Sequence, residues 1–223
     1  MEWREYPDRE ALFLSLANKL TGELIQALRL NGAASLCVPG GTTPGPLFDL
    51  LSGVDLEWEH ISVVLNDERW VAEDSPRSNT ALLRARLLRG RAAQARLLPL
   101  RADAPTPEEA LESLSAAIAP HLPLTCVVLG MGEDMHTASL FPGGDRLADA
   151  LAADAPVLIP MRAPGAEEPR VTLTAPVLAG AMHIHLLILG QAKRDALERA
   201  QGLPADLAPV RAVLDNATVH WAE

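Results

Sequence analysis

Apolar residues recur along the chain in two alternating spacings. Residues 8–30 carry a leucine at every fourth position from Leu12 to Leu28, with polar residues opposite, which predicts an amphipathic helix. The next apolar run, 34–38, is short, and it leads into the sequence Pro-Gly-Gly-Thr-Thr-Pro, after which helical spacing resumes. This order predicts a strand, a glycine turn and a second helix.

The same alternation continues to the end of the sequence. Short apolar runs predict strands, and longer amphipathic stretches predict helices. The predicted strands are 61–65, 97–100, 124–129, 157–160, 184–189 and 217–221, and the further predicted helices are 80–88, 107–122, 193–200 and 207–214. Strands that are apolar throughout and separated by helices belong to a parallel sheet that is covered on both faces. The sequence therefore predicts a single α/β domain, residues 1–223, with three layers: a mostly parallel, Rossmann-like sheet between helices.

The composition fits such a domain and excludes several classes of protein. Of 223 residues 48% are hydrophobic, and 19 basic against 29 acidic side chains give a formal net charge of −10. A chain of this length can bury a core without metals or disulfides. The negative charge argues against a nucleic-acid or anionic-membrane surface, because both partners require a concentrated basic patch.

The cysteines and the N-terminal sequence predict a cytoplasmic protein. Cys37 and Cys126 lie in apolar runs, which indicates reduced core thiols rather than a disulfide or metal pair. The charged sequence MEWREYPDRE lacks the basic segment and apolar core of a signal peptide. No uninterrupted apolar stretch reaches the roughly 18 residues that suggest a membrane span.

The first candidate site is Gly40-Gly41-Thr42-Thr43, which lies between a predicted strand and a predicted helix. Glycines let the backbone approach a ligand closely, and the free N–H groups and hydroxyls at a helix start can bind a phosphate. The alternative is an ordinary turn in which a threonine caps the helix. The Gly-Lys-Ser/Thr ending of a Walker loop is absent.

The second candidate site is the charged sequence NDERWV, which directly follows the predicted strand 61–65. Ligands of parallel sheets bind beyond the carboxyl ends of the strands, so we expect at least one of Asp67 and Arg69 to point into that crevice. Arginine offers a planar fork for phosphate or carboxylate, and aspartate can orient it or take a proton. A solvated charged loop is the alternative.

The third candidate site is LGMGEDMHTASLFPG, residues 129–143. A dinucleotide-binding loop is a weak interpretation here, because Met135 stands where its third glycine would be. Asp134 and His136 are more informative, since they share one loop at a strand end. Imidazole titrates near neutral pH and can take a proton from water, while a nearby carboxylate can fix its tautomer.

Isolated cations and histidines occupy two later segments. Arg170 begins the sequence RVTLT and Lys193 ends GQAK, where each is either a ligand contact or an ordinary surface residue. His183 and His185 share one face of a predicted strand, and we interpret them as packing or surface residues rather than metal ligands. Neither the Cys/His spacing of a zinc site nor the G-x-S-x-G elbow of serine hydrolases occurs.

Together these segments resemble the motifs of the 6-phosphogluconolactonases, within the wider group that contains glucosamine-6-phosphate isomerase. GGTTP resembles that family's GGSTP, NDERWV its DERxV, and LGMGEDMHTASLFPG its LGxGxDGHTASLFPG, while RVTLT and GQAK resemble two later motifs. The matches occur in the family's order and span nearly the whole chain. The resemblance implies hydrolysis of 6-phosphoglucono-δ-lactone to 6-phosphogluconate, in the oxidative pentose phosphate pathway, without a metal or organic cofactor.

The resemblance also implies roles for the candidate residues. His136 would be the general base that activates water, and Asp134 or Asp67 would orient the imidazole or the substrate. Arg69 would hold substrate oxygens or the developing oxyanion. The phosphate would be held by Gly40, Gly41, Thr42, Thr43, Arg170 and Lys193. Such charge-assisted contacts explain how an acidic protein can bind an anion locally.

Three positions depart from the family pattern. Thr42 replaces a serine and keeps the hydroxyl, and Ala72 stands where a proline is usual. Met135 replaces the glycine directly before the histidine. If this position has a positive φ, its Cβ costs about 1 to 2 kcal/mol.

Two other functions fit the same fold. The isomerases usually read GHIAFNEP, with a glutamate five residues after the histidine, whereas this chain has Phe141, which cannot transfer a proton. A non-catalytic sugar-phosphate sensor would keep the cations and need no base, so the presence of Asp134 and His136 argues against it. No helix-turn-helix or basic extension of a DNA-binding sensor is visible. Nothing in the sequence predicts the oligomeric state.

Overall fold

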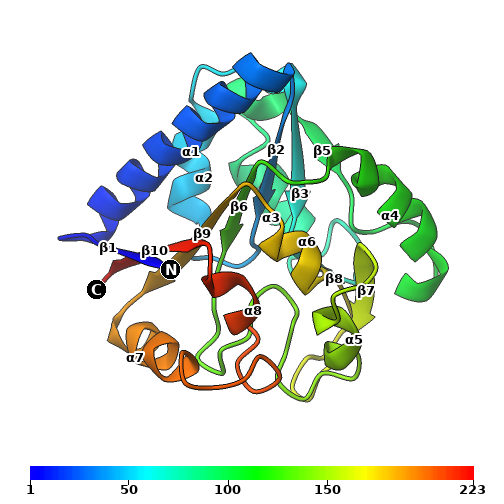
Figure 1. Ribbon diagram of the computed structural model, residues 1–223. Coiled ribbons are helices and arrows are strands. Elements are labelled where there is room, and N and C mark those ends of the chain that lie inside the picture. Colours follow the sequence, from blue (N-terminus) through cyan, green and yellow to red (C-terminus); the bar gives the residue numbers. More distant parts are fainter.

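The centre of the molecule is a seven-stranded parallel sheet (Figure 1). The computed structural model describes residues 1–223. The strand order is β1-β10-β9-β6-β2-β3-β5, and every neighbouring pair is parallel, which confirms the predicted fold class. The strands are β1 (Glu2–Glu5), β2 (Ala34–Val38), β3 (Ile61–Leu65), β5 (Arg96–Leu98), β6 (Cys126–Leu129), β9 (His183–Leu189) and β10 (Ala217–Ala222).

Helices cover the sheet, with α1 and α2 on one side and α4 on the other (Figure 1). Every residue of the central strands β2, β3 and β6 is buried, as expected for strands covered on both faces. The helices are α1 (Arg9–Asn31), α2 (Gly45–Ser52), α3 (Asn79–Arg86), α4 (Leu111–Ile118), α5 (Leu147–Leu151), α6 (Ala175–Ala179), α7 (Gln191–Ala200) and α8 (Arg211–Leu214).

The leucine stripe of the first predicted helix is the buried face of α1. Its residues Leu12, Leu16, Leu20 and Leu24 are fully buried. The helix begins after Asp8, whose carboxylate accepts a hydrogen bond from the N–H of Ala11 at 2.7 Å, and it ends at a left-handed glycine. The helix predicted from the leucine spacing therefore begins and ends close to the residues that cap it.

A second, three-stranded antiparallel sheet was not predicted. It consists of β4 (Asp67–Arg69), β8 (Arg170–Leu173) and β7 (Leu158–Met161), in the order β4-β8-β7. The stretch 157–160 was predicted as part of the main sheet, and the charged sequence after β3 was predicted as a loop. β4 consists of three charged residues and pairs with β8 across about a hundred residues of chain, and β7 pairs with β8 rather than with a strand of the main sheet.

Prolines shorten two of the predicted helices. The stretch 107–122 contains α4 between the 3-10 turns Pro107–Glu109 and Ala119–His121, and of 207–214 only α8 is helical. Pro120 and Pro209 lack the N–H group that a continuous helix needs, and their rings clash with the preceding turn. β1 was also missed, because it is a polar strand at the edge of the sheet.

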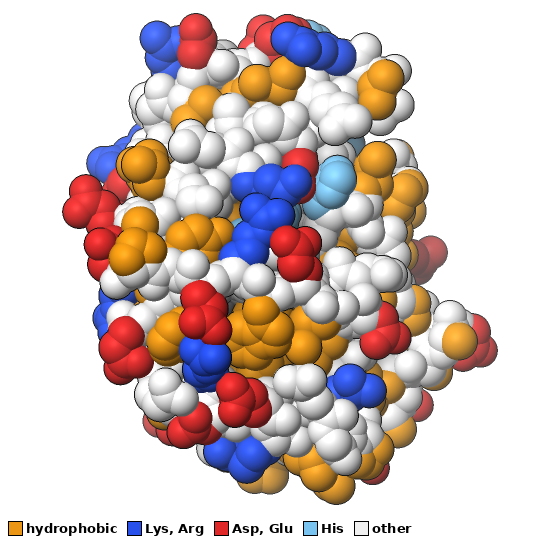
Figure 2. Space-filling view, turned by 60° about the vertical axis from the view of Figure 1, so that its left-hand side comes forward, with side chains coloured by type: hydrophobic (Ala, Val, Ile, Leu, Met, Phe, Trp, Pro, Cys, Tyr) orange, Lys and Arg blue, Asp and Glu red, His pale blue; other side chains and the backbone are white.

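Charged side chains are spread over the surface. On the face shown in Figure 2, acidic and basic side chains lie beside one another with apolar side chains between them. Arg194 on α7 is an example: it contacts Glu5 at 2.7 Å and Glu198 at 3.2 Å, and its guanidinium lies 4.6 Å from the ring centroid of Trp221. None of the helices combines the length and the apolar character that crossing a bilayer requires.

A buried hydrogen-bond chain joins α1 to β9 and β10. Glu23 accepts from Nε2 of His185 at 2.8 Å, and Nδ1 of His185 lies 3.0 Å from Nε2 of His220. The hydroxyl of Tyr6 lies 2.9 Å from Nδ1 of His220, and Lys19 lies 3.1 Å from the second carboxylate oxygen. When both imidazoles are neutral, every group has a partner of the opposite kind. His185 is thus a packing residue, as predicted, with a hydrogen-bonding role.

We expect the buried hydrogen-bond chain to make the stability of the protein sensitive to acid. Burial, followed by the neighbouring His185, lowers the pKa of His220 from 6.5 to about 3. Between these pH values the unfolded state binds more protons than the folded state. The contribution of His220 to the free energy of unfolding is therefore complete above pH 6.5 and is lost as the pH falls toward 3. The free energy of unfolding should fall by up to about 1.4 kcal/mol per pH unit there.

The His220→Gln variant tests this expectation, because its amide can keep both a donor and an acceptor without titrating. Denaturant unfolding at pH 5, 6 and 7 should show a weaker pH dependence for the variant than for the wild type. Equal slopes in the two proteins would show that His220 is not the group responsible.

Candidate active site

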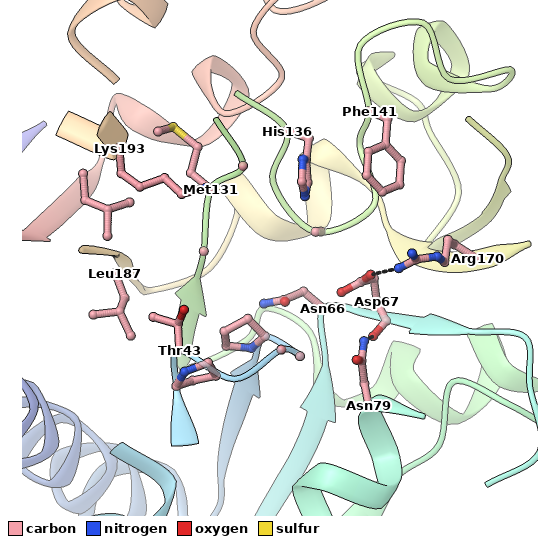
Figure 3. Close-up of a pocket in the computed structure, with 18 of the residues that line it drawn as sticks. Thr43, Asn66, Asp67, Asn79, Met131, His136, Phe141, Arg170, Leu187 and Lys193 are labelled. Carbon is pink, nitrogen blue, oxygen red and sulfur yellow. Dashed lines mark hydrogen bonds and ion pairs between the residues drawn. The ribbon is translucent and has the colours of Figure 1, made fainter. Parts of the chain in front are cut away.

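A cleft of about 410 Å³ lies at the carboxyl ends of β2, β3, β6 and β9 (Figure 3). Its walls come from the loops after these strands and from the second sheet. Most of the residues predicted from the sequence line it: Gly40, Gly41, Thr43, Asp67, Arg69, His136, Arg170 and Lys193. Thr42 is exposed outside the cleft, and Asp134 contacts His136 without lining it. A cavity of this size suits a small phosphorylated sugar.

His136 and Asp134 form a hydrogen-bonded pair in the loop after β6. Nδ1 of His136 lies 2.5 Å from Oδ1 of Asp134, which also accepts the backbone N–H of His136 at 3.2 Å. A proton on Nδ1 satisfies this contact and leaves the lone pair of Nε2 free to act as a base. Gly132 is required here, because a Cβ at this residue would overlap both partners of the pair. Asp134 is therefore the carboxylate in contact with the imidazole.

The backbone directly before His136 is left-handed. Met135 has a φ of 67°, and the turn is closed by hydrogen bonds from its N–H to the carbonyl of Gly132 at 3.0 Å and from Val210 to its own carbonyl at 3.1 Å. This is the conformation that a glycine adopts without strain. The chain thus keeps the conformation typical of a glycine at a position that carries a Cβ.

We expect glycine to be the better small residue at position 135. Met135→Gly should be more stable than Met135→Ala by about 1 kcal/mol, because both lose the side chain but only alanine keeps the strained Cβ. The exposed Met182, whose φ is not positive, serves as control. There the order should be reversed, with alanine more stable than glycine. Denaturant unfolding of the four variants measures both differences, and the same order at both positions would contradict the assignment of strain.

Asp67 is buried under the cleft as the first residue of β4. Its Oδ2 accepts from the hydroxyl of Ser139 at 2.6 Å and lies 3.6 Å from Nη1 of Arg170. Burial raises the pKa of Asp67, while the hydrogen bond from Ser139 and the charge of Arg170 act in the opposite direction. Asp67 therefore contacts Arg170 and Ser139, whereas Asp134 contacts the imidazole. No role was predicted for Ser139, although it lies in the quoted motif.

Two arginines leave N–H groups unpaired at the cleft. Arg69 donates through Nη1 to the carbonyl of Arg77 at 2.6 Å and to Oδ1 of Asn79 at 3.2 Å, while its buried Nε has no partner. The buried Nε of Arg170 is also without a partner. Its guanidinium lies 5.8 Å from the ring centroid of Phe141. Both arginines line the cleft, where their planar guanidinium groups can interact with an anion.

The cationic residues occupy opposite sides of the cleft. Figure 3 shows Lys193 and Thr43 on one side and Arg170 beside Asp67 on the other. Lys193 forms no ion pair, so its ammonium group is available to an anion. Gly41, in the loop that carries Thr43, lines the cleft and has a φ of 83°, a conformation that glycine adopts without strain.

Asn66 at the end of β3 was not predicted as a site residue. Its amide Nδ2 donates to the carbonyl of Val128 at 2.8 Å, which fixes the orientation of the side chain, and its buried Oδ1 has no partner. Asn66 opens the NDERWV motif, so the signal was present in the sequence. Asp67 and Arg69 were predicted instead, because charged side chains are the more obvious ligands of an anion.

This chain is similar to known proteins along nearly its whole length. The family described as glucosamine-6-phosphate isomerases/6-phosphogluconolactonase matches residues 7–221. A 6-phosphogluconolactonase of Mesorhizobium japonicum is 43% identical over 99% of this chain and 94% of its own length. One from Pseudomonas aeruginosa is 41% identical over 92% of this chain and 88% of its own. The crystal structure of a 6-phosphogluconolactonase from Shewanella baltica superposes with a TM-score of 0.96 at 32% identity, covering 100% of this chain and 98% of that one.

Proposed function

Because the chain belongs to the glucosamine-6-phosphate isomerase/6-phosphogluconolactonase family, we propose that it hydrolyses 6-phospho-D-glucono-1,5-lactone to 6-phospho-D-gluconate. The reaction is the lactone-opening step of the oxidative pentose phosphate pathway. The main observation behind the proposal is the His136–Asp134 pair at a cleft that is also lined by the cationic residues Arg69, Arg170 and Lys193. Relatives named 6-phosphogluconolactonase that match along nearly the whole chain support it.

In the proposed mechanism His136 acts as general base. Its Nε2 takes a proton from a water molecule, and the water oxygen adds to the lactone carbonyl to give a tetrahedral intermediate. The ring C–O bond then breaks, and the proton returns from His136 to the departing ring oxygen. Asp134 keeps the imidazole in the required tautomer and stabilises its charged form. Catalysis of this kind typically contributes about 10²- to 10⁴-fold, and a strained ester needs no metal or organic cofactor for it.

The positions of the cations suggest how the substrate lies. We assign the phosphate to Lys193, Thr43 and the glycine loop. The resemblance also places Arg170 with the phosphate, but its position across the cleft from Lys193 favours a contact with the lactone end (Figure 3). There Arg69 and Arg170 stabilise the oxygen on which negative charge develops.

The sister activity of the family, isomerisation and deamination of an amino-sugar phosphate, is not favoured. It requires an additional acid or base near the histidine. Phe141 occupies the position five residues after His136, and its ring centroid lies 4.6 Å from that of the imidazole. A phenyl ring cannot transfer a proton, so the proton transfer between neighbouring sugar carbons lacks its second group.

A cytoplasmic location fits the chemistry of the chain. Cys37 and Cys126 are both buried and unpaired. Free thiols persist in reducing compartments.

The proposal is tested by offering the wild-type protein two substrates. The lactone is generated in situ from glucose 6-phosphate, and its disappearance is compared with spontaneous hydrolysis at near-neutral pH. Glucosamine 6-phosphate is assayed in parallel for ammonia release. We expect acceleration of the first reaction only. Activity on the amino sugar alone would overturn the proposal, and binding of 6-phosphogluconate without turnover of either substrate would favour a sensor.

A further inference from the structure

Asn79 lies between the glycine loop and Arg69, and we propose that it is a positioning residue that holds the Arg69 guanidinium in its reactive orientation. The inference rests on the proposed lactonase function, in which Arg69 stabilises negative charge on the substrate. It assigns no contact between Asn79 and substrate. Asn79 is the first residue of α3, and it lines the cleft.

The orientation of the Asn79 amide is fixed from two sides. Its Nδ2 donates to the carbonyl oxygen of Asp67 at 3.0 Å, so the nitrogen and oxygen of the amide cannot be exchanged. The oxygen therefore points to Arg69, whose Nη1 donates to it at 3.2 Å. Because Asn79 is buried, water competes poorly for either bond.

Only one nitrogen of Arg69 is committed to these protein acceptors. Nη1 donates to Asn79 and to the carbonyl of Arg77, whereas the buried Nε has no partner. A guanidinium is planar, so fixing Nη1 also fixes the plane and the direction of the remaining N–H groups. Without Asn79, the guanidinium would be held at a single carbonyl and could rotate away from the cleft.

The glycine loop is built around the same amide. A Cβ at Gly40 would overlap the Cγ, Oδ1 and Nδ2 atoms of Asn79, so the loop backbone rests directly on the amide. Glycine at this position is thus explained by Asn79 as well as by close approach of a phosphate. One side chain therefore supports both the loop assigned to the phosphate and the arginine assigned to the lactone.

Glu68 anchors the backbone that carries Asn79. Its buried carboxylate accepts hydrogen bonds from the N–H groups of Arg69, Asn79 and Thr80 at 2.7, 2.8 and 2.7 Å, and from the hydroxyl of Ser78 at 3.2 Å. The start of α3 is therefore held independently of the Asn79 side chain. This separation makes it possible to remove the amide and to loosen the helix start in different variants.

A double-mutant cycle tests whether Asn79 acts through Arg69. Steady-state kinetics with the lactone are measured for wild type, Asn79→Ala, Arg69→Ala and the double variant. We expect Asn79→Ala to lower kcat about 10- to 100-fold, since a small misplacement of a catalytic group has effects of this size, and to change KM less than about threefold. In the Arg69→Ala background the same substitution should have no further effect.

Two controls separate positioning from general damage. Ser78→Ala removes the hydroxyl that caps α3 through the N–H of Ala81 and leaves the Asn79 amide in place, so kcat should stay within about threefold. If Asn79→Ala does not fold, Asn79→Asp keeps the shape but loses the donor to Asp67. It should also be slower, again only when Arg69 is present. Losses that multiply in the double variant, or an equal loss in Ser78→Ala, would overturn the proposal.

Failure of the lactonase function itself would be recognised separately. In that case wild type would not accelerate hydrolysis, and the same four proteins would be titrated with 6-phosphogluconate by calorimetry. If Asn79 positions Arg69, the loss of affinity on Asn79→Ala disappears in the Arg69→Ala background. Equal losses in both backgrounds would overturn the positioning role.

Discussion

His136→Ala is expected to lower kcat for lactone hydrolysis by at least about 100-fold with little change in KM, because it removes the only free imidazole nitrogen in the cleft. The Nδ1 atom is engaged by Asp134, which leaves Nε2 as the base. The substrate contacts assigned to Lys193 and the glycine loop stay intact. Initial rates of lactone disappearance, corrected for spontaneous hydrolysis, measure the effect.

The matched control is His60→Ala, which removes an exposed histidine outside the cleft. It should keep the wild-type rate, and thermal unfolding should show that both variants are folded. A His136→Ala variant with more than about a tenth of wild-type kcat would mean that another group activates the water.

Lys193→Ala is expected to raise KM about 10- to 100-fold and to change kcat much less. A hydrogen bond between charged groups contributes about 1.5 to 3 kcal/mol, and the contact with the phosphate is made equally in the ground state and the transition state, so its loss appears in KM. Lys193→Arg should recover part of the affinity because it keeps the charge. Kinetics over a wide range of lactone concentration separate the two parameters.

Lys19→Ala is the natural control, since Lys19 is the other lysine of the chain. It lies on α1 and pairs with Glu23, outside the cleft. Its removal should leave KM unchanged. If Lys193→Ala instead lowered kcat at constant KM, Lys193 would belong to the reacting end of the cleft, and the proposed orientation of the substrate would be reversed.

The parallel sheet could be predicted from the sequence because each of its central strands is a local signal. β2, β3 and β6 are apolar apart from one serine in each of β2 and β3, and a glycine or a charged residue follows each within two positions, so burial on both faces is expected. The second sheet carries no such signal. β4 and β8 are each stabilised by pairing with a partner distant in sequence, and the short, charged Asp67–Arg69 resembles a loop when considered alone.

The sequence motifs predicted which segments form the site, and the structure shows which of their side chains contact one another. Strand ends bring Asp67, His136 and Lys193 into one cleft, as expected for a parallel sheet. Which carboxylate orients the imidazole could not be decided from spacing, because Asp134 and Asp67 were both plausible. Asp134 lies 2.5 Å from Nδ1 of His136, whereas Asp67 hydrogen-bonds Ser139, and we therefore propose the orienting role for Asp134.

The two asparagines that line the cleft could not be identified as site residues from the sequence. Asn66 and Asn79 belong to segments that read as a strand end and a helix start, and either could have been a simple cap. Their importance lies in partners on other elements: Val128 for Asn66, and Arg69 and Gly40 for Asn79. Such contacts depend on how the strands are ordered, which single-sequence patterns do not specify.

The most direct test of the central claim is the rate at which 6-phosphogluconolactone, generated in situ at near-neutral pH, disappears with wild-type protein, with His136→Ala and without protein. We expect wild type to accelerate hydrolysis clearly, and His136→Ala to reduce this catalysed rate by at least about 100-fold. A wild-type rate equal to the spontaneous one would contradict the lactonase function. Equal acceleration by wild type and His136→Ala would contradict the assignment of the base.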